Sequence, residues 1–190
     1  MLDELSDEKL VGEYLASRAG ALEMLVGRYF KYVYNFLIKQ VGDVREAQDL
    51  TQETFLRVWK NLKKFDQNRS FKVWLFRIAR NAAIDYLRKK KILTVASLES
   101  EADDGSFLDN IPDPNGSIFT KIEQQEMEKE TFEMLKAMPE IYRTVIVLYY
   151  NEGLNFREIG ELLDEPLDTV KSRHRRALIL LKKSLNSHKT

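Results

Sequence analysis

The feature that most limits the possible folds of this chain is an interruption near its middle, from Thr94 to Ser117. The segment TVASLESEADDGSFLDNIPDPNGS is rich in Ser, Asp, Glu, Gly and Pro, and its few apolar residues follow no period. Such a composition favours a flexible chain, whose ends lie roughly 25 Å apart on average. We therefore predict two small helical domains, residues 1–93 and 118–190, joined by a flexible acidic linker at residues 94–117.

Helical spacing of apolar residues runs through both halves, and no stretch shows the alternation of a strand, which predicts an all-α fold. The punctuation agrees with helices. Ser6 can cap a first helix, and Gly42 can end the long apolar stretch from Leu22 to Val41. Asp43 with Glu46 resembles a capping box that opens the next helix. After a polar break at residues 65–70, residues 71–91 are predicted to form one long helix.

Composition excludes several kinds of site. The chain has no cysteine and two histidines, so neither a disulfide nor a thiolate zinc site is available, and we expect no metal or cofactor. The first twenty residues are acidic and broken by charges, unlike a signal peptide. Nothing is apolar for long enough to cross a bilayer, so we expect no membrane insertion and a cytoplasmic location.

The formal net charge of zero hides a strong asymmetry along the chain. Between Arg57 and Lys91 there are 12 lysines and arginines against only Asp66 and Asp85. A local excess of this size is typical of a surface that binds phosphates, although a solvated basic face is the alternative.

Residues 156–185 have the pattern of a helix-turn-helix. A short helix at residues 156–163 is followed by a turn at Asp164 and Glu165 and a second helix with Pro166 at its first position. At 100° per residue, one side of the second helix is apolar, and the other carries Asp168, Lys171, Ser172, Arg175 and Lys182, with Arg176 at its edge. A helix with such a face can enter the major groove. An ordinary helical hairpin with a solvated basic face is the alternative.

Two further interpretations concern the same helix. His174 falls on its inner half, which favours a packing role over ligand binding. The aliphatic run LILLKKSL at residues 178–185 is interpreted as core.

The segment from Ala47 to Leu62 combines two faces. Ala47, Phe55, Val58, Trp59 and Leu62 gather on one, and Asp49, Glu53 and Lys60 lie opposite, flanked by Gln52 and Leu56. An apolar side chain within a polar rim is typical of protein docking surfaces.

The helix at residues 71–91 carries a core stripe and a second stripe formed by Trp74, Arg77, Asn81 and Arg88. Aromatic planes can stack unpaired bases, guanidinium groups can bind the backbone, and an amide can pair with a base edge. The alternative is that Trp74 belongs to the core and the arginines are solvated.

The segments DLTQETFLRVWKNL, FKVWLFRIARNAAIDYLRKKK and MPEIYRTVIVLYYNEGLNFREIGELLDEPLDTVKSRHRRA resemble, in this order, the extracytoplasmic-function sigma factors of bacterial RNA polymerase. In that family the first domain, region two, binds the β′ clamp helices and the minus-ten element. The last domain, region four, binds the β flap and the minus-thirty-five element. The resemblance implies a non-enzymatic initiation factor whose partners are core polymerase and promoter DNA, with an anti-sigma protein as a further partner class.

The resemblance also assigns residues to three surfaces. Together with the helical spacing it assigns polymerase binding to Asp49, Gln52, Glu53, Leu56 and Lys60. The minus-ten surface comprises Phe65, Asn68, Ser70, Trp74, Arg77, Arg80, Asn81 and Arg88. The minus-thirty-five surface comprises Lys171, Ser172, Arg173, Arg175 and Arg176, of which Arg173 points partly inward by its position on the helix.

The chain departs from the family pattern at three positions. Asp168 stands where Gly is usual, Gly160 where Ala is usual, and His174 where an aliphatic residue is common. A carboxylate on the DNA-facing side can repel phosphate or accept a hydrogen bond from cytosine. Asp168 therefore leaves open which minus-thirty-five sequence is preferred.

Two other functions are alternatives to a sigma factor. A stand-alone helix-turn-helix regulator would need a ligand pocket or a self-complementary face, and the sequence shows neither. A nucleic-acid enzyme would need clustered carboxylates, metal ligands or an activated nucleophile, and Asp49 with Glu53 is the one tight acidic pair.

Overall fold

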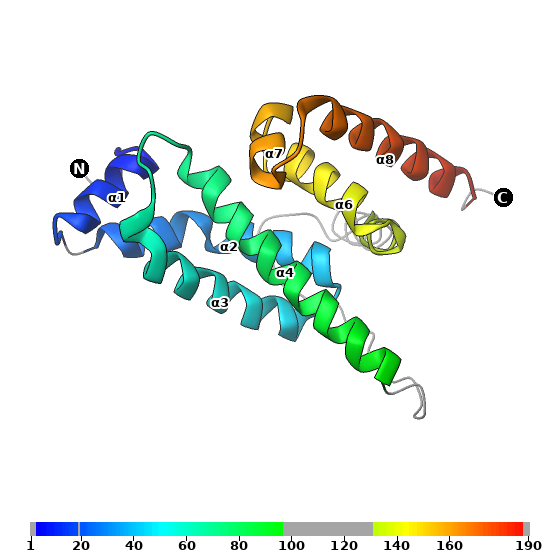
Figure 1. Cartoon of the computed structure of the whole chain (residues 1–190), viewed down its shortest axis with the longest axis horizontal. Coiled ribbons are helices and arrows are strands. Elements are labelled where there is room, and N and C mark those ends of the chain that lie inside the picture. Colours follow the sequence, from blue (N-terminus) through cyan, green and yellow to red (C-terminus); the bar gives the residue numbers. More distant parts are fainter. Residues whose placement is uncertain (1–2, 19, 97–130, 188–190) are drawn as a thin grey trace, which may run out of the picture.

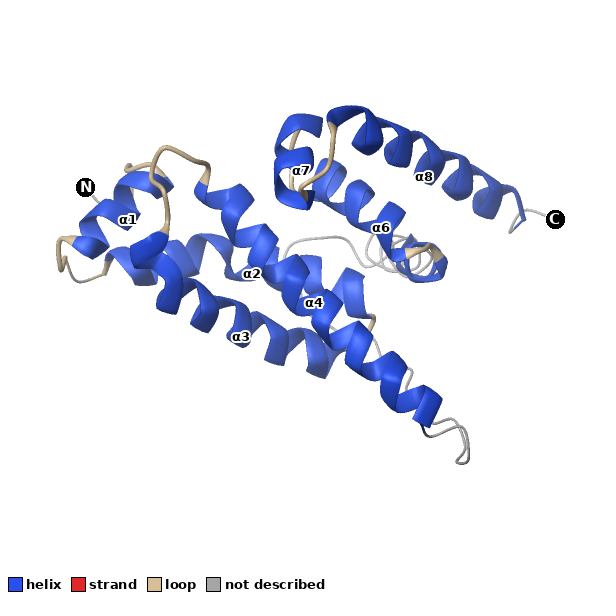
Figure 2. Ribbon diagram, viewed as in Figure 1, coloured by secondary structure: helices blue, strands red, loops and turns tan. Residues whose placement is uncertain are grey.

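The computed structural model describes residues 3–18, 20–96 and 131–187, and within them every regular element is a helix (Figure 2). The helices form two groups. One contains α1, α2, α3 and α4, and the other contains α6, α7 and α8 (Figure 1). The expectation of an all-α fold with two helical regions is confirmed.

The amino-terminal group begins at the caps that the sequence predicts. α1 (Asp7–Leu15) follows Ser6, whose side chain accepts the Lys9 N–H at 3.4 Å. α2 (Ala21–Val41) ends at Gly42, which has a positive φ of 74°. α3 (Val44–Asn61) follows Asp43, whose carboxylate accepts the Glu46 N–H at 3.1 Å. A short 3-10 turn, η1 (Leu62–Lys64), leads to the loop before α4.

α4 (Phe71–Ala96) crosses this group and completes its core. Phe36 of α2 meets Phe76 of α4 edge to face at 5.4 Å between ring centroids, and both side chains are fully buried. Burying a large apolar side chain of this kind contributes about 1.5–3 kcal/mol. The position of α4 against α2 and α3 therefore depends on this aromatic contact and its aliphatic neighbours.

The carboxy-terminal group starts with helical residues 131–137, followed by α6 (Glu140–Ile146) and a π-helical turn, η2 (Val147–Asn151). α7 (Phe156–Leu163) opens with a complete capping box between Asn155 and Glu158. α8 (Leu167–Ser187) packs across α6 and α7, with Val170 and Ala177 fully buried.

The structure changes several sequence expectations. α4 continues to Ala96, beyond the predicted end at Lys91, so residues 94–96 are helical rather than linker; residues 97–117 lie outside the described residues. Pro166 precedes α8 and accepts the Val170 N–H at 3.2 Å, so it caps the helix instead of opening it. The interpretation of residues 178–185 as core was wrong for all but Leu181, which is half-buried against the core; the other four aliphatic side chains are exposed: Leu178, Ile179, Leu180 and Leu185.

Candidate nucleic-acid interface

The outer face of α3 presents the predicted docking residues. All five are exposed, and the Leu56 side chain is 53% accessible among charged neighbours: Asp49, Gln52, Glu53, Leu56 and Lys60. The opposite side of the helix buries Ala47 and Val58. Trp59 was predicted to face inward with Ala47 and Val58, but it does not. It is 51% exposed, and its indole N–H donates to the Tyr14 hydroxyl at 2.7 Å, which ties α3 to α1.

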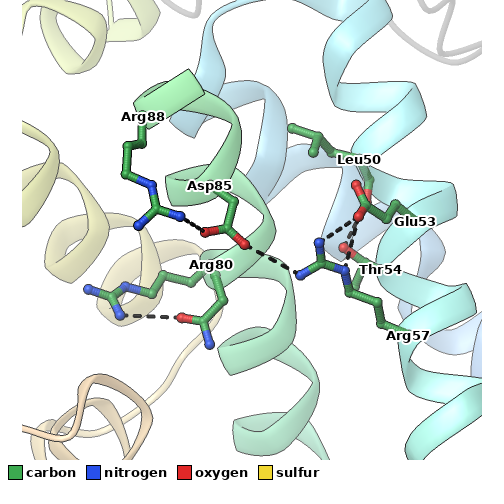
Figure 3. Close-up of polar contacts among 8 residues, drawn as sticks. Leu50, Glu53, Thr54, Arg57, Arg80, Asp85 and Arg88 are labelled. Atoms are coloured by element: carbon green, nitrogen blue, oxygen red, sulfur yellow. Dashed lines mark hydrogen bonds and ion pairs between the residues drawn. The ribbon is translucent and has the colours of Figure 1, made fainter. Parts of the chain in front are cut away.

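A chain of ion pairs connects this face of α3 to α4 (Figure 3). The Arg57 guanidinium contacts Glu53 at 2.5 Å and Asp85 of α4 at 3.7 Å. Asp85 also contacts Arg88 at 3.1 Å. Because all four side chains are substantially exposed, these contacts orient the groups more than they stabilise the fold.

The loop before α4 is held by an aromatic cluster. Phe65 is buried and meets Phe71 at 5.7 Å and Trp74 at 5.0 Å between ring centroids. In this conformation Phe65 therefore packs the loop and does not face solvent. Asn68 is exposed, and its side-chain amide donates to Asp66 at 3.0 Å. The Asn68 backbone N–H, which donates to the same carboxylate at 3.0 Å, and this side-chain contact hold the pKa of the Asp66 carboxyl below its usual range.

The predicted second stripe of α4 is only partly open to solvent. Asn81 and Arg88 are exposed, whereas Trp74, Arg77 and Arg80 are half-buried. Arg80 donates to the Asn81 side chain at 3.4 Å, and the Arg77 guanidinium donates to a backbone carbonyl of α7. The stripe thus has the chemistry expected for nucleic acid, with Arg77 bound to α7 and Arg88 paired with Asp85 of its own helix.

α1 contributes residues to this region that sequence patterns did not indicate. Ser6, Glu8 and Lys9 line a hollow together with loop residues 67–70, which include the predicted Asn68 and Ser70. The Glu8 carboxylate accepts the Phe71 N–H at 3.0 Å and so caps the start of α4. A helix period shows which residues share a face, but it carries no signal for a contact made from a segment some sixty positions away.

The turn between α7 and α8 explains one departure from the family pattern. Asp164 has a positive φ of 57°, and the Glu165 N–H donates to the Gly160 carbonyl at 2.9 Å. A Cβ atom at Gly160 would lie 2.9 Å from the Glu165 carbonyl oxygen. In this form of the turn, an alanine at position 160 would force the Glu165 carbonyl to shift, and glycine avoids that contact.

The first half of α8 exposes the predicted duplex-reading surface. Lys171, Ser172, Arg175 and Arg176 are exposed, with Asp168 beside them at 4.0 Å from the Lys171 amine. Arg173 instead contacts Glu165 at 2.8 Å and is half-buried, in agreement with its predicted inward position.

His174 packs on the inner side of α8, which confirms the packing role. Its ring lies 5.0 Å from the ring centroids of both Tyr149 and Phe156, and its Nε2 is buried without a hydrogen-bond partner. Burial lowers the pKa of His174 from its usual value, because it disfavours the charged imidazolium. The residue thus helps to hold α8 against η2 and α7.

Neither a membrane span nor a metal cluster occurs in the described parts of the chain. No helix there combines the length and apolarity needed to cross a bilayer. No three of their histidine, aspartate or glutamate side chains converge as metal ligands would.

Comparison with known proteins agrees with both helical regions. The model of sigma-70 region 2 matches residues 25–92, and that of sigma-70 region 4 matches residues 134–183. The chain is 33% identical over 183 residues to the ECF RNA polymerase sigma factor SigW of Bacillus subtilis (strain 168), covering 96% of this chain and 98% of that protein. It is 30% identical over 182 residues to the ECF RNA polymerase sigma-E factor of Haemophilus influenzae, covering 93% and 94% of the two chains.

Two solved structures have the same fold. The sigma factor RpoE of Bartonella quintana, in complex with the anti-sigma factor NepR, superposes with a TM-score of 0.71 at 21% identity, covering 86% of this chain and 96% of that chain. CnrH in complex with the cytosolic domain of CnrY gives a TM-score of 0.70 at 22% identity, covering 95% and 97%. With both regions matched in order and near-complete coverage of its relatives, the chain belongs to the ECF sigma factors, which are transcription initiation factors and not enzymes.

Proposed function

We propose that this protein binds core RNA polymerase through α3, recognises the minus-thirty-five element as duplex through α8, and traps melted minus-ten bases on α4 and the loop before it. Residues 1–93 and 118–190 would carry these tasks as separate domains, in the cytoplasm, where the polymerase acts. One observation supports the proposal above all others: the same chain exposes the basic face of a helix-turn-helix and, on α3, a leucine within a charged rim.

The duplex-reading step rests on the first half of α8. Lys171, Arg175 and Arg176 are exposed on the helix that follows the turn, which is the placement of a recognition helix. A guanidinium group can donate two hydrogen bonds to guanine, and a good pair of this kind discriminates by about 1–3 kcal/mol. Ser172 can contact a base or a phosphate beside it.

The minus-ten step rests on α4. Asn81 is exposed and can pair with the edge of an unstacked base, while the partly exposed indole of Trp74 offers a stacking plane. Unstacking a base costs a few kcal/mol, and stacking on an aromatic side chain returns about 1–3 kcal/mol per base. Because these contacts form only with open strands, they shift the promoter toward its melted form without any catalytic group.

The polymerase-binding step rests on the outer face of α3. Leu56 supplies an apolar anchor, and its neighbours Asp49, Glu53 and Lys60 supply a charged rim. Such an arrangement is typical of docking surfaces. An anti-sigma protein is a further proposed partner, because the two solved relatives above are complexes with an anti-sigma factor and with the cytosolic domain of CnrY.

Run-off transcription on a library of promoter fragments, with purified core polymerase, tests the proposal. We expect defined start sites only when the protein is added. Asn81→Ala, Arg176→Ala and Leu56→Asp should each weaken initiation at those sites, and Arg18→Ala, which removes an exposed arginine outside the proposed surfaces, should not. Binding to duplex DNA without any redirection of core polymerase would contradict the proposal and favour a stand-alone regulator.

A further inference from the structure

The start of α4 is capped from two sides, and one of the caps comes from α1, which packs beside it (Figure 1). Phe71 is the first residue of α4, and the first N–H groups of a helix have no partner within the helix. The Ser70 hydroxyl accepts one of them, the Val73 N–H, at 3.3 Å. The Glu8 carboxylate of α1 accepts the Phe71 N–H at 3.0 Å. The beginning of α4 therefore depends on a local cap and on a distant one.

The loop before α4 also lies close to α1. Residues 67–70 line a hollow together with the first turn of α1. A Cβ atom at Gly12 would lie 3.0 Å from the Gln67 side-chain oxygen, so glycine leaves room for the loop at this point. The side chains of residues 66–69 are all exposed, which means that core packing does not fix them. Their arrangement depends instead on the buried Phe65 at one end of the loop and the start of α4 at the other.

α1 is itself firmly attached to its domain. Its inner side chains, Leu10 and Val11, are fully buried. The Arg28 guanidinium of α2 donates to the Asp7 carboxylate in the first turn of α1 at 2.9 Å. α1 is therefore a fixed support, and Glu8 ties the start of α4 to it.

We infer that Glu8 is a positioning residue for the minus-ten contact. By capping Phe71 it holds the exposed loop residues, Asn68 above all, in the arrangement that distinguishes one base from another. This inference rests on the proposed function of the loop before α4. It adds α1, which precedes the residues matched to sigma-70 region 2, to the elements that determine promoter preference.

Two possible effects of the Glu8 carboxylate on DNA binding have opposite signs. A negative charge beside a phosphate backbone repels it, so removing the charge should by itself strengthen binding to every strand. Loss of the loop arrangement should instead weaken binding to the preferred sequence alone. The ratio of affinities for the promoter strand and for a strand with one base replaced separates the two, because sequence-independent attraction cancels in it.

Fluorescence anisotropy of labelled single strands measures this ratio for the full-length chain. The strands carry the non-template sequence of a promoter found by run-off transcription, with each minus-ten base replaced in turn. At the position where Asn68→Ala weakens the preference, Glu8→Ala should lower it by about fivefold or more, as expected for one lost hydrogen bond. Glu8→Gln should retain it, because the amide oxygen can still accept the Phe71 N–H. An unchanged ratio in Glu8→Ala would overturn the inference, as would an equal loss in Glu8→Gln.

Two matched variants separate positioning from stability. Glu13→Ala removes a carboxylate of the same helix that pairs with Arg18 and does not line the hollow. Val58→Ala removes part of a buried side chain from the same domain. Both should keep the wild-type ratio at a temperature where all the chains are folded. A loss in Val58→Ala as large as that in Glu8→Ala would show that the ratio follows stability, and the inference would fall.

Amide hydrogen exchange of the free protein distinguishes failure of this inference from failure of the proposed function. Without the Glu8 acceptor, the Phe71 N–H should exchange about tenfold faster. Exchange at the wild-type rate would overturn the inference whatever the DNA result. If exchange accelerates in Glu8→Ala but the wild-type chain prefers no base on any strand, the proposed minus-ten function fails and base discrimination by Glu8 falls with it, while the cap itself stands.

Discussion

α4 and α8 both carry basic side chains that we propose to contact promoter DNA, yet the structure treats them differently. On α8, Lys171, Arg175 and Arg176 face solvent. On α4, Arg77 is half-buried and bound to a carbonyl of α7, whereas Arg88 is exposed. The duplex-reading surface is therefore accessible in the free protein, whereas the single-strand surface is partly occupied. The two basic surfaces therefore differ in how much of their cationic charge is already engaged by other groups of the chain.

The largest expected effect concerns Glu152, the buried carboxylate that directly follows η2. Burial raises the pKa of Glu152 from 4.5 to about 7, against the attraction of Lys72 and Lys39. The folded chain thus binds an extra proton relative to the unfolded chain, and its stability falls as the pH rises from about 4.5 to 7. Glu152→Gln removes this loss and should add about 2–3 kcal/mol to the free energy of unfolding at pH 8, with a smaller gain at pH 5.

Urea denaturation at pH 5 and pH 8 measures this change. Equal gains in stability at both pH values would show that the carboxylate is not the cause.

The second prediction tests the accessible side of the comparison. Arg176→Ala should weaken binding of the free protein to its minus-thirty-five duplex by about 1–2 kcal/mol, or roughly five- to thirtyfold. Binding of the single strand should not change, because Arg176 lies on α8 and not on the proposed single-strand surface of α4. Electrophoretic mobility shifts with both probes measure the two effects, and Arg18→Ala serves as the matched arginine control. A parallel loss on both probes would contradict the separation of the two surfaces.

The third prediction concerns the turn that orients α8. A methyl group at Gly160 would lie 2.9 Å from the Glu165 carbonyl oxygen, so the turn must shift. Gly160→Ala should lower the free energy of unfolding by about 1–2 kcal/mol and weaken duplex binding. Gly27→Ala is the matched control, because nothing lies within 4 Å of a Cβ atom there, and it should stabilise α2 by about 0.5–1 kcal/mol. Thermal unfolding measures both variants: the midpoint temperature should fall for Gly160→Ala and rise for Gly27→Ala.

The smallest effect is expected at the ion pairs between α3 and α4. Arg57→Ala removes contacts to Glu53 and Asp85 that are exposed, so the free energy of unfolding should change by less than about 0.5 kcal/mol. A larger loss, measured by urea denaturation, would mean that these pairs hold α4 in place. α4 would then be fixed from both sides, by α3 as well as by α7.

Much of the fold follows from local patterns. Ser6, Gly42 and Asp43 cap their helices as predicted, because capping depends on residues within one turn. The exposed face of α3 and the turn at Asp164 also follow from helical spacing and local turn chemistry.

The parts that could not be predicted depend on what covers a face. Trp59 and Leu178 lie on apolar sides of their helices, yet both are exposed, because no helix among the described residues buries them. Arg77 lies on a polar side, yet a helix from the other domain covers it. Periodicity identifies the members of a face and contains no information about its neighbours, so contacts between distant segments appear only in three dimensions.

The length of α8 has a mechanical consequence. Its 21 residues span about 32 Å, and its fully buried side chains, Val170 and Ala177, lie in its first half, whereas Leu178, Ile179 and Leu180 are exposed, so α8 resembles a rod held mainly through its first half. A tilt of about 10° at the turn would move the far end by about 5 Å but Arg173, some 10 Å along the rod, by only about 2 Å. Side chains proposed to contact bases are therefore located near the pivot, where recognition tolerates tilting of the rod.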